Sequence, residues 1–151
     1  MAKAPVFTST EDRHLIFNAS HQQLKCYKAD GTLEWHVQAR GKGAGDSSQT
    51  NGNTPPGLYL LDWAEHMSRE KGYGPHRIHL NPVDLDKGKK RYGIYIHGGG
   101  SDLKDPFAPQ QGWEKTHGCI RVQNQDLGLL VSKVHDVHSK KAQLWLTVQW
   151  W

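Results

Sequence analysis

Cysteine is scarce in this sequence, with only Cys26 and Cys119 among 151 residues. Two thiols form at most one disulfide, so the chain is not a small domain held together by several bridges. A single bridge between the two cysteines remains open from the sequence alone. Cys26 lies in a run of alternating apolar and polar residues and is expected to act as a small buried hydrophobic side chain.

Long hydrophobic runs are also missing, and the mean hydropathy is -0.75. No segment has the length of apolar sequence that a membrane-spanning helix requires, so no membrane span is expected. The start of the chain, MAKAPVFTSTEDRH, lacks the apolar stretch of a secretory signal peptide. These features leave three origins open: a cytosolic protein, a protein exported by another route, or a chain from which a leader has been removed.

Charge of one sign is concentrated at one place, where Lys87, Lys89, Lys90 and Arg91 form a short basic cluster. A cluster of this size is typical of a solvated loop, so no nucleic-acid partner is expected. The net charge of +4 would favour encounters with an anionic polymer, of which a bacterial wall is one example.

Short apolar segments separated by turn residues predict a mostly β fold for residues 1–151 as a single domain. The expected strands are 14–17, 23–27, 32–39, 57–62, 75–81, 92–96 and 142–148. Residues 41–56 are rich in Gly, Ser, Asn, Thr and Pro and are expected to form a long surface loop. Residues 66–74 are ambiguous, and residues 1–12 are expected to be a loosely ordered terminus.

One main helix is expected between Asn124 and Lys140. Apolar residues recur there at spacings of three and four, which is the pattern of an amphipathic helix: Leu127, Leu130, Val131, Val134 and Val137. Lys140 and Lys141 suit the negative C-terminal end of the helix dipole. The sequence therefore predicts an α+β domain dominated by strands, with this helix before the last strand.

Cys119 lies in the polar segment GWEKTHGCIRVQN and is a candidate nucleophile. A thiol is only a few per cent ionised at neutral pH, so it needs a base or a positive environment. His117 is close in sequence, but residues i and i+2 of an extended chain stay about 6 to 7 Å apart. His97 ends the segment YGIYIH and can face the thiol from a neighbouring strand, so it is the favoured base. A buried structural cysteine beside a surface histidine remains the alternative.

Glycine and tryptophan residues near these side chains are further candidates for the site. Gly118 allows a sharp bend that can aim the amides of Gly118 and Cys119 at one point, as in an oxyanion hole. The three glycines that begin at Gly98 allow a ligand to approach the backbone closely. Trp113 is a candidate for a cleft wall, with plain packing as the alternative.

Ten histidines raise the alternative of a zinc site. His76 and His79 are three residues apart, however, which puts them on opposite faces of a strand, and no HExxH helix is present. His135 and His138 share a helical face but are typical of a solvated or capping pair. No metal ion is expected.

The residues around the candidate nucleophile and base resemble a known family. His97-Gly98 at the end of a strand, followed by Thr116-His117-Gly118-Cys119-Ile120-Arg121, is similar to the signature of the L,D-transpeptidase (YkuD) family. The segment from Asn53 to Tyr59, NTPPGLY, resembles the TPxG segment that leads into a strand in that family. The resemblance covers roughly Leu15 to Val148 and implies an L,D-transpeptidase-like β-sandwich.

The resemblance also implies an activity, that of a bacterial enzyme acting on peptidoglycan stem peptides. Cys119 would attack the carbonyl between the third, L-centre residue and the fourth, D-residue, releasing D-alanine and leaving a thioester. An amine acceptor would complete transpeptidation, whereas water would make the enzyme an L,D-carboxypeptidase. The sequence is also compatible with a wall-targeting toxin or phage enzyme of the same family, and with a non-catalytic wall-binding domain.

The family's functional positions carry over residue by residue. Cys119 matches the nucleophile, His97 matches the general base, and His117 and Gly118 belong to the segment that supplies oxyanion-hole amides. The candidates for shaping the site or binding substrate are Thr116, Arg121, Gly98 and Trp113. No cofactor is implied. The expected place of action is the periplasm or cell wall, reached with a secretion or delivery partner, from a phage, or after removal of a leader.

Overall fold

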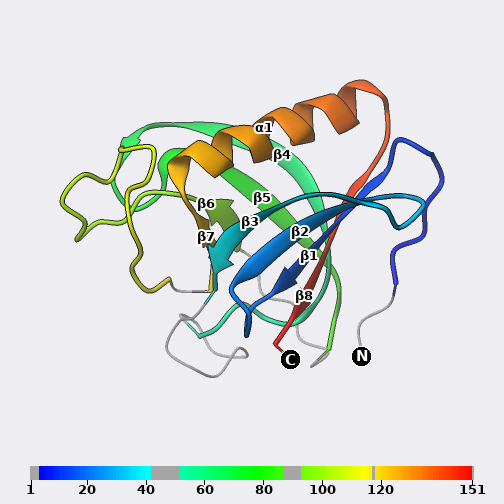
Figure 1. Cartoon of the computed structure of the whole chain (residues 1–151), viewed down its shortest axis with the longest axis horizontal. Coiled ribbons are helices and arrows are strands. Elements are labelled where there is room, and N and C mark those ends of the chain that lie inside the picture. The colour runs from blue at the N-terminus through cyan, green and yellow to red at the C-terminus, as the bar shows by residue number, and fades with distance from the viewer. Residues whose placement is uncertain (1–3, 42–51, 87–92, 117, 151) are drawn as a thin grey trace.

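The structure is a computed structural model that describes residues 4–41, 52–86, 93–116 and 118–150 (Figure 1). Its strands are β1 (Arg13–Asn18), β2 (Gln23–Lys28), β3 (Leu33–Arg40), β4 (Gly57–Glu70), β5 (Gly74–Leu85), β6 (Tyr95–His97), β7 (Ile120–Val122) and β8 (Leu144–Gln149). Its helix is α1 (Asn124–Ser139). The basic cluster at 87 to 91, position 92 and most of the expected 41–56 loop lie outside the described residues.

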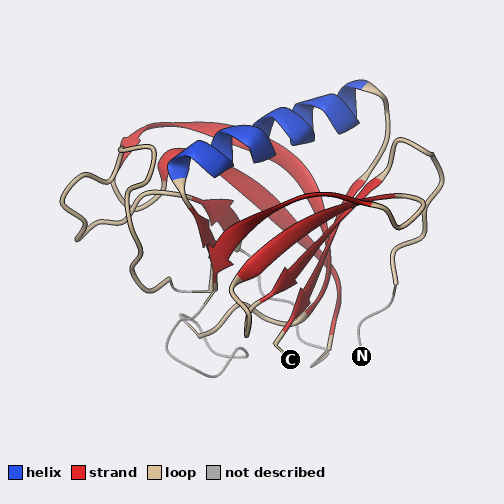
Figure 2. Cartoon of the chain, viewed as in Figure 1, coloured by secondary structure: helices blue, strands red, loops and turns tan. Residues whose placement is uncertain are grey.

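The strands are hydrogen-bonded in one closed order, β1-β2-β3-β7-β6-β5-β4-β8. Neighbours are antiparallel except β1 with β8 and β6 with β7, which are parallel, so the sheet is mixed. Figure 2 shows α1 lying across the strands, where it packs against β4 and β5. The prediction of a mostly β fold with one main C-terminal helix is confirmed. The two sheets expected of a sandwich are parts of one continuous sheet.

The core lies between the inner faces of the strands and the apolar stripe of α1. Alternate residues of each strand face it, as the two-residue period of a strand requires. The largest fully buried side chains are Tyr59, Phe17, Leu15, Leu24, Leu61, Ile78, Ile96, Ile120, Leu127, Leu130, Leu144 and Leu146. Of the helical residues that the three- and four-residue spacing selected, the five apolar ones are buried, whereas His138, the alternative to Val137 as the last of them, is half-buried.

The hairpin of β4 and β5 is longer than the sequence indicates. The expected strand 57–62 continues to Glu70, so most of the ambiguous segment 66–74 is strand and turn. Three register shifts interrupt the pairing of β4 with β5, and such bulges bend and twist a strand. Gly74 turns the chain with φ 75°, and a Cβ there would lie 2.8 Å from the amide nitrogen of Gly99. The hairpin tip therefore packs directly on the glycine loop after β6.

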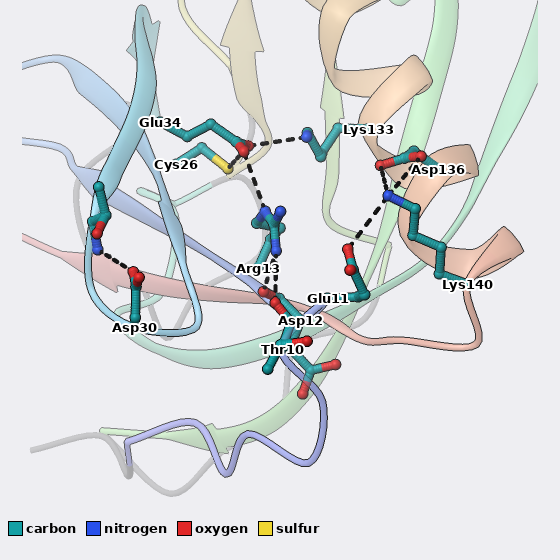
Figure 3. A network of polar contacts seen from close by, with 11 residues as sticks. Thr10, Glu11, Asp12, Arg13, Cys26, Asp30, Glu34, Lys133, Asp136 and Lys140 are labelled. Carbon is teal, nitrogen blue, oxygen red and sulfur yellow. Dashed lines mark hydrogen bonds and ion pairs between the residues drawn. The ribbon is translucent and has the colours of Figure 1, made fainter.

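Charged side chains connect α1 to the first strands (Figure 3). Glu34 of β3 binds Lys133 of α1 at 2.9 Å and Arg13 of β1 at 3.4 Å. The Cys26 sulfur lies 3.8 Å from Glu34 Oε1. Burial, followed by the charge of Glu34, raises the pKa of the Cys26 thiol to about 12. Cys26 is thus a buried thiol beside a carboxylate, and it does not form the disulfide with Cys119 that the sequence left open.

Candidate active site

The candidate site lies on the outer face of the sheet, where the parallel strands β6 and β7 meet. Ile96 pairs with Ile120 and both are fully buried, so the next pair, His97 and Arg121, faces the opposite side. The same register continued by one residue places Cys119 beside Tyr95. The side chains of Cys119 and His97 therefore project from one face, one strand and two residues apart, with roughly 8 Å between their Cα atoms.

His97 is held as a neutral imidazole with a defined tautomer. Its Nδ1 lies 2.7 Å from the carbonyl oxygen of Gly98, and because a carbonyl only accepts, Nδ1 carries the proton. Nε2 is then left as the acceptor. His97 is only 3% exposed, and this burial lowers its pKa to about 4, with the charges of Arg121 and Arg77 acting in the same direction. The ring is therefore uncharged at neutral pH, with Nε2 as its unprotonated nitrogen.

Cys119 precedes β7 and is 9% exposed. Its Sγ lies 3.9 Å from the carbonyl oxygen of Gly93. Gly118 has φ 106°, a value that glycine adopts without strain, and its amide donates to Thr116 Oγ1 at 3.3 Å. His117, the local alternative to His97 as base, lies outside the described residues.

Thr54 braces the turn that carries Cys119, although sequence reasoning did not select it as a site residue. Its hydroxyl is fully buried and lies 2.7 Å from the Gly118 carbonyl oxygen, 3.1 Å from that of Gly41 and 3.3 Å from that of Cys119. Its own carbonyl accepts a hydrogen bond from Trp150 Nε1 at 2.7 Å. The sequence signal at Thr54 was the NTPPGLY segment, which resembles a segment that leads into a strand. It did not indicate that Thr54 contacts the turn that carries Cys119.

Arg121 donates its guanidinium hydrogens to backbone carbonyls. Nη1 donates to Glu114 at 2.7 Å and to Lys115 at 2.9 Å, Nη2 donates to Gly72 at 3.3 Å, and Nε donates to Gly98 at 3.5 Å. These bonds join the segment before the thiol, the tip of the β4–β5 hairpin and the loop after β6. Burial lowers the pKa of Arg121, while the charges of Glu114 and Cys119 oppose that effect, so the guanidinium is within electrostatic range of the thiol. This geometry fits the site-shaping role that the sequence left open for Arg121, and a contact of Arg121 with substrate stays a prediction.

Asn124, the first residue of α1, fastens the loop after β6. Its Oδ1 accepts from the Gly99 amide at 3.0 Å, and its Nδ2 donates to the carbonyls of Pro106 at 2.8 Å and Ala108 at 2.7 Å. A Cβ at Gly98 would overlap Asn124 Oδ1, so a side chain cannot replace glycine there without displacing this amide. Gly98 thus contributes a carbonyl for His97 and space for Asn124.

A cavity of about 430 Å³ opens beside the segment that precedes the thiol. Its lining residues come from the turn between β1 and β2, the end of β3, the segment before the thiol and the end of the described chain: Ala19, Ser20, Gln22, Arg40, Gly41, Trp113, Glu114, Lys115 and Trp150. Arg40 stacks on Trp113 with its guanidinium carbon 4.5 Å from the ring centroid. Trp113 therefore lines a cavity, and its contact with substrate stays a prediction.

Neither a metal site nor a membrane span is found in the described part of the chain. Within residues 4–41, 52–86, 93–116 and 118–150, no group of three or more His, Cys, Asp or Glu side chains is arranged to hold a metal ion. Over the same ranges, no helix combines the length and the apolar character needed to cross a membrane.

Comparison with known proteins agrees with this fold and motif. A family model of the L,D-transpeptidase catalytic domain (YkuD) matches residues 12–139. The chain belongs to the L,D-transpeptidase catalytic-domain family. No curated protein sequence matches it significantly.

Several solved structures share the fold. They include the helical cell shape determining protein Pgp2 from Campylobacter jejuni, with a TM-score of 0.66 and 21% identity over 91% of this chain and 47% of that one. An L,D-transpeptidase (Yku) from Stackebrandtia nassauensis has a TM-score of 0.55 and 18% identity over 90% and 54%. Mycobacterium tuberculosis L,D-transpeptidase 1 has a TM-score of 0.54 and 12% identity over 91% and 62%. The chain spans about half the length of the first of these structures.

Proposed function

We propose that this chain is a cysteine acyltransferase that opens the bond between the L-centre third residue and the D-residue of a peptidoglycan tetrapeptide stem. Membership of a family of L,D-transpeptidase catalytic domains supports the substrate class. The observation that carries the proposal is the tautomer of His97. With Nδ1–H donated to Gly98, Nε2 is the proton acceptor on the face from which Cys119 projects.

In the first half of the reaction, His97 Nε2 takes the proton from Cys119 as the sulfur attacks the scissile carbonyl carbon. The carbonyl oxygen becomes an oxyanion, for which the Cys119 amide is the candidate donor, and the Gly118 amide could join it only by giving up its hydrogen bond to Thr116 Oγ1. His97 then gives its proton to the nitrogen of the departing D-residue, the C–N bond breaks, and a thioester on Cys119 remains. The imidazole is neutral at the start and at the end of this half-reaction.

The surrounding residues act on geometry. The Thr54 hydroxyl donates chiefly to the Gly118 carbonyl and also lies close to the Cys119 carbonyl, so it contacts the peptide groups on both sides of Cys119 and helps to fix the attacking sulfur. Arg121 holds the loops on either side of the site. Fixed groups of this kind cost little reorganisation when charge develops in the transition state.

The second half of the reaction transfers the acyl group from Cys119 to a nucleophile that His97 deprotonates. An amine from a second stem gives an L,D-transpeptidase, which is the activity we favour, and water gives an L,D-carboxypeptidase. The cavity lined by Trp113, Glu114 and Lys115 lies beside the segment leading to the thiol and offers room for an acceptor stem. The proposed site of action is the cell wall or periplasm, where peptidoglycan is found.

The test uses a synthetic tetrapeptide stem with and without an amine acceptor, with product masses read by mass spectrometry. A cross-linked product with acceptor supports the transpeptidase, whereas tripeptide alone in both reactions supports the carboxypeptidase. Cys119→Ala is the inactive control, and Cys26→Ala is the matched control at the other cysteine. A folded wild-type protein that binds the stem without producing either product would be a wall-binding domain instead.

A further inference from the structure

Two rows of side chains cross the outer face of the sheet; the first passes through His97 and the second leads to Cys119. Strand register aligns the first row, Glu65 with Arg77, Arg77 with His97, and His97 with Arg121. The second row, here called the aromatic row, consists of Trp63, His79 and Tyr95. His79 pairs with Tyr95 in the register, and the same register continued to β7 brings the row to Cys119.

The rings of the aromatic row are in direct contact. Trp63 stacks on His79 with ring centroids 4.0 Å apart and an interplanar angle of 12°. His79 meets Tyr95 edge to face at 4.8 Å, and Tyr73 in turn contacts both Tyr95, at 5.9 Å, and His97, at 4.9 Å. A continuous series of ring contacts therefore runs from the exposed Trp63 to the buried candidate general base, His97.

Polar contacts from the first row fix the orientation of these rings. Glu65 Oε2 accepts from Arg77 Nε at 2.6 Å and lies 3.1 Å from His79 Nε2. The Arg77 guanidinium lies over Tyr95 at 4.5 Å and over Tyr73 at 5.1 Å. Because His79 is held by Glu65, the Trp63 ring stacked on it is presented in one orientation before any ligand arrives. Pre-organisation of this kind reduces the entropy lost on binding.

Trp63 nevertheless remains 50% exposed, which is unusual for the largest apolar side chain. The exposed Trp63 ring stacks on His79, Glu65 contacts that histidine, and Arg77 binds Glu65, so carboxylate and guanidinium groups lie near an exposed aromatic surface. A pyranose ring matches such a surface, because it has a face of C–H bonds that packs on an aromatic ring and a rim of hydroxyl groups that bind carboxylate and guanidinium groups.

We propose that Trp63 is the stacking platform for a sugar ring of the glycan strand whose stem peptide is attacked by Cys119. This inference rests on the proposed function for its substrate. Trp63 and the nucleophile are separated by three strand spacings, or about 14 Å. Three extended residues, from the scissile carbonyl back to the start of the stem, span about 10 Å, and the short acyl linker to the sugar spans the rest. The platform thus lies where the sugar of a bound stem would arrive.

The test compares a free tetrapeptide with the same tetrapeptide attached to its disaccharide. The wild type should turn over the sugar-linked substrate with a kcat/KM about tenfold higher, from a lower KM. Trp63→Ala should remove that preference while leaving kcat/KM for the free tetrapeptide unchanged, and Trp63→Phe should keep part of it. Leu129→Ala, which removes a 58% exposed apolar side chain on α1, is the matched control and should change neither value.

The proposal is overturned if the wild type shows no preference for the sugar-linked substrate, or if Trp63→Ala weakens both substrates equally. Calorimetric titration with a glycan oligomer that carries no stem peptide separates this result from failure of the proposed function. If the wild type turns over neither substrate, loss of oligomer binding in Trp63→Ala still supports the platform. Absent binding by the wild type, or equal binding by Trp63→Ala, rejects it.

Discussion

Cys26 and Cys119 are both nearly inaccessible, yet their surroundings prepare them for opposite roles. Cys26 lies within β2, faces the core, and has a carboxylate 3.8 Å from its sulfur, which helps to raise its pKa to about 12. Cys119 follows a glycine with φ 106°, faces the outer side of the sheet, and has Arg121 within electrostatic range. Strand alternation and the charge of the neighbours, and not exposure, therefore separate a structural thiol from a candidate nucleophile.

The largest effect is expected from His97, the candidate base for Cys119. Replacing it tests whether Cys119 differs from Cys26 in having a partner that takes its proton. His97→Gln should lower kcat/KM for the tetrapeptide by about 100- to 10,000-fold, because general-base assistance is removed. His14→Gln is the matched control, since burial also lowers the pKa of His14 to about 4 and its Nε2 lies 2.7 Å from Thr147 Oγ1, away from Cys119. Equal losses in the two variants, measured by steady-state kinetics, would remove His97 from the mechanism.

The buried state of His97 also predicts a dependence of stability on pH. The folded pKa of about 4 lies below the unfolded value near 6.5, so only the unfolded chain binds this proton between these values. Stability should therefore be lost as the pH falls from 6.5 to 4, by up to about 3 kcal/mol from this residue. Urea denaturation at pH 7 and pH 4.5 should show a smaller loss for His97→Gln than for the wild type. An unchanged difference would mean that His97 is protonated in the folded protein.

A smaller effect is expected from Thr54, whose hydroxyl contacts the turn that carries Cys119. Within the described residues, Cys26 has no counterpart of this contact. Thr54→Val keeps the shape of the side chain but removes its hydrogen bonds to the carbonyls of Gly118 and Cys119. We expect a loss of about 1–3 kcal/mol of stability and a decrease in kcat of about tenfold. Thr54→Ser keeps the hydroxyl and should retain most of the activity. If both variants behave alike in thermal denaturation and kinetics, the hydroxyl does not hold the turn.

The smallest effect should come from Cys26, whose thiol lies on the inner face of the sheet. Cys26→Ala removes one buried atom from the core and should lower the free energy of unfolding by about 1 kcal/mol. Turnover of the tetrapeptide should be unchanged, because Cys26 lies on the inner face of the sheet. A folded Cys26→Ala protein with greatly reduced kcat would show that the two thiols are coupled and would break the comparison.

Much of the fold could be predicted from local patterns in the sequence. The apolar spacing predicted a helix from Asn124 to Lys140, and the helix ends at Ser139. The extension of β4 beyond Asp62 was missed because the sequence there is mostly polar and three register shifts disturb the alternation of the strand. Family membership followed from the THGCIR block and is confirmed by the family model.

The site was only partly accessible from the sequence. A histidine that ends one strand and a thiol that precedes another were recognisable because local composition marks both. The roles of Thr54 and Arg121 depend on bonds to backbone carbonyls far along the chain, which no local pattern reveals. The aromatic row was invisible for the same reason, because it arises from the register of β4, β5 and β6.

Trapping of the acyl-enzyme tests the central claim most directly, because the proposed mechanism requires a covalent bond to one particular sulfur. A carbapenem, whose strained carbonyl acylates nucleophilic thiols, should add its mass once to the wild type and once to Cys26→Ala, and peptide mapping should place the adduct on Cys119. Cys119→Ala should remain unmodified. Modification of folded Cys119→Ala to the same extent, or a folded wild type that stays unmodified, would contradict the mechanism.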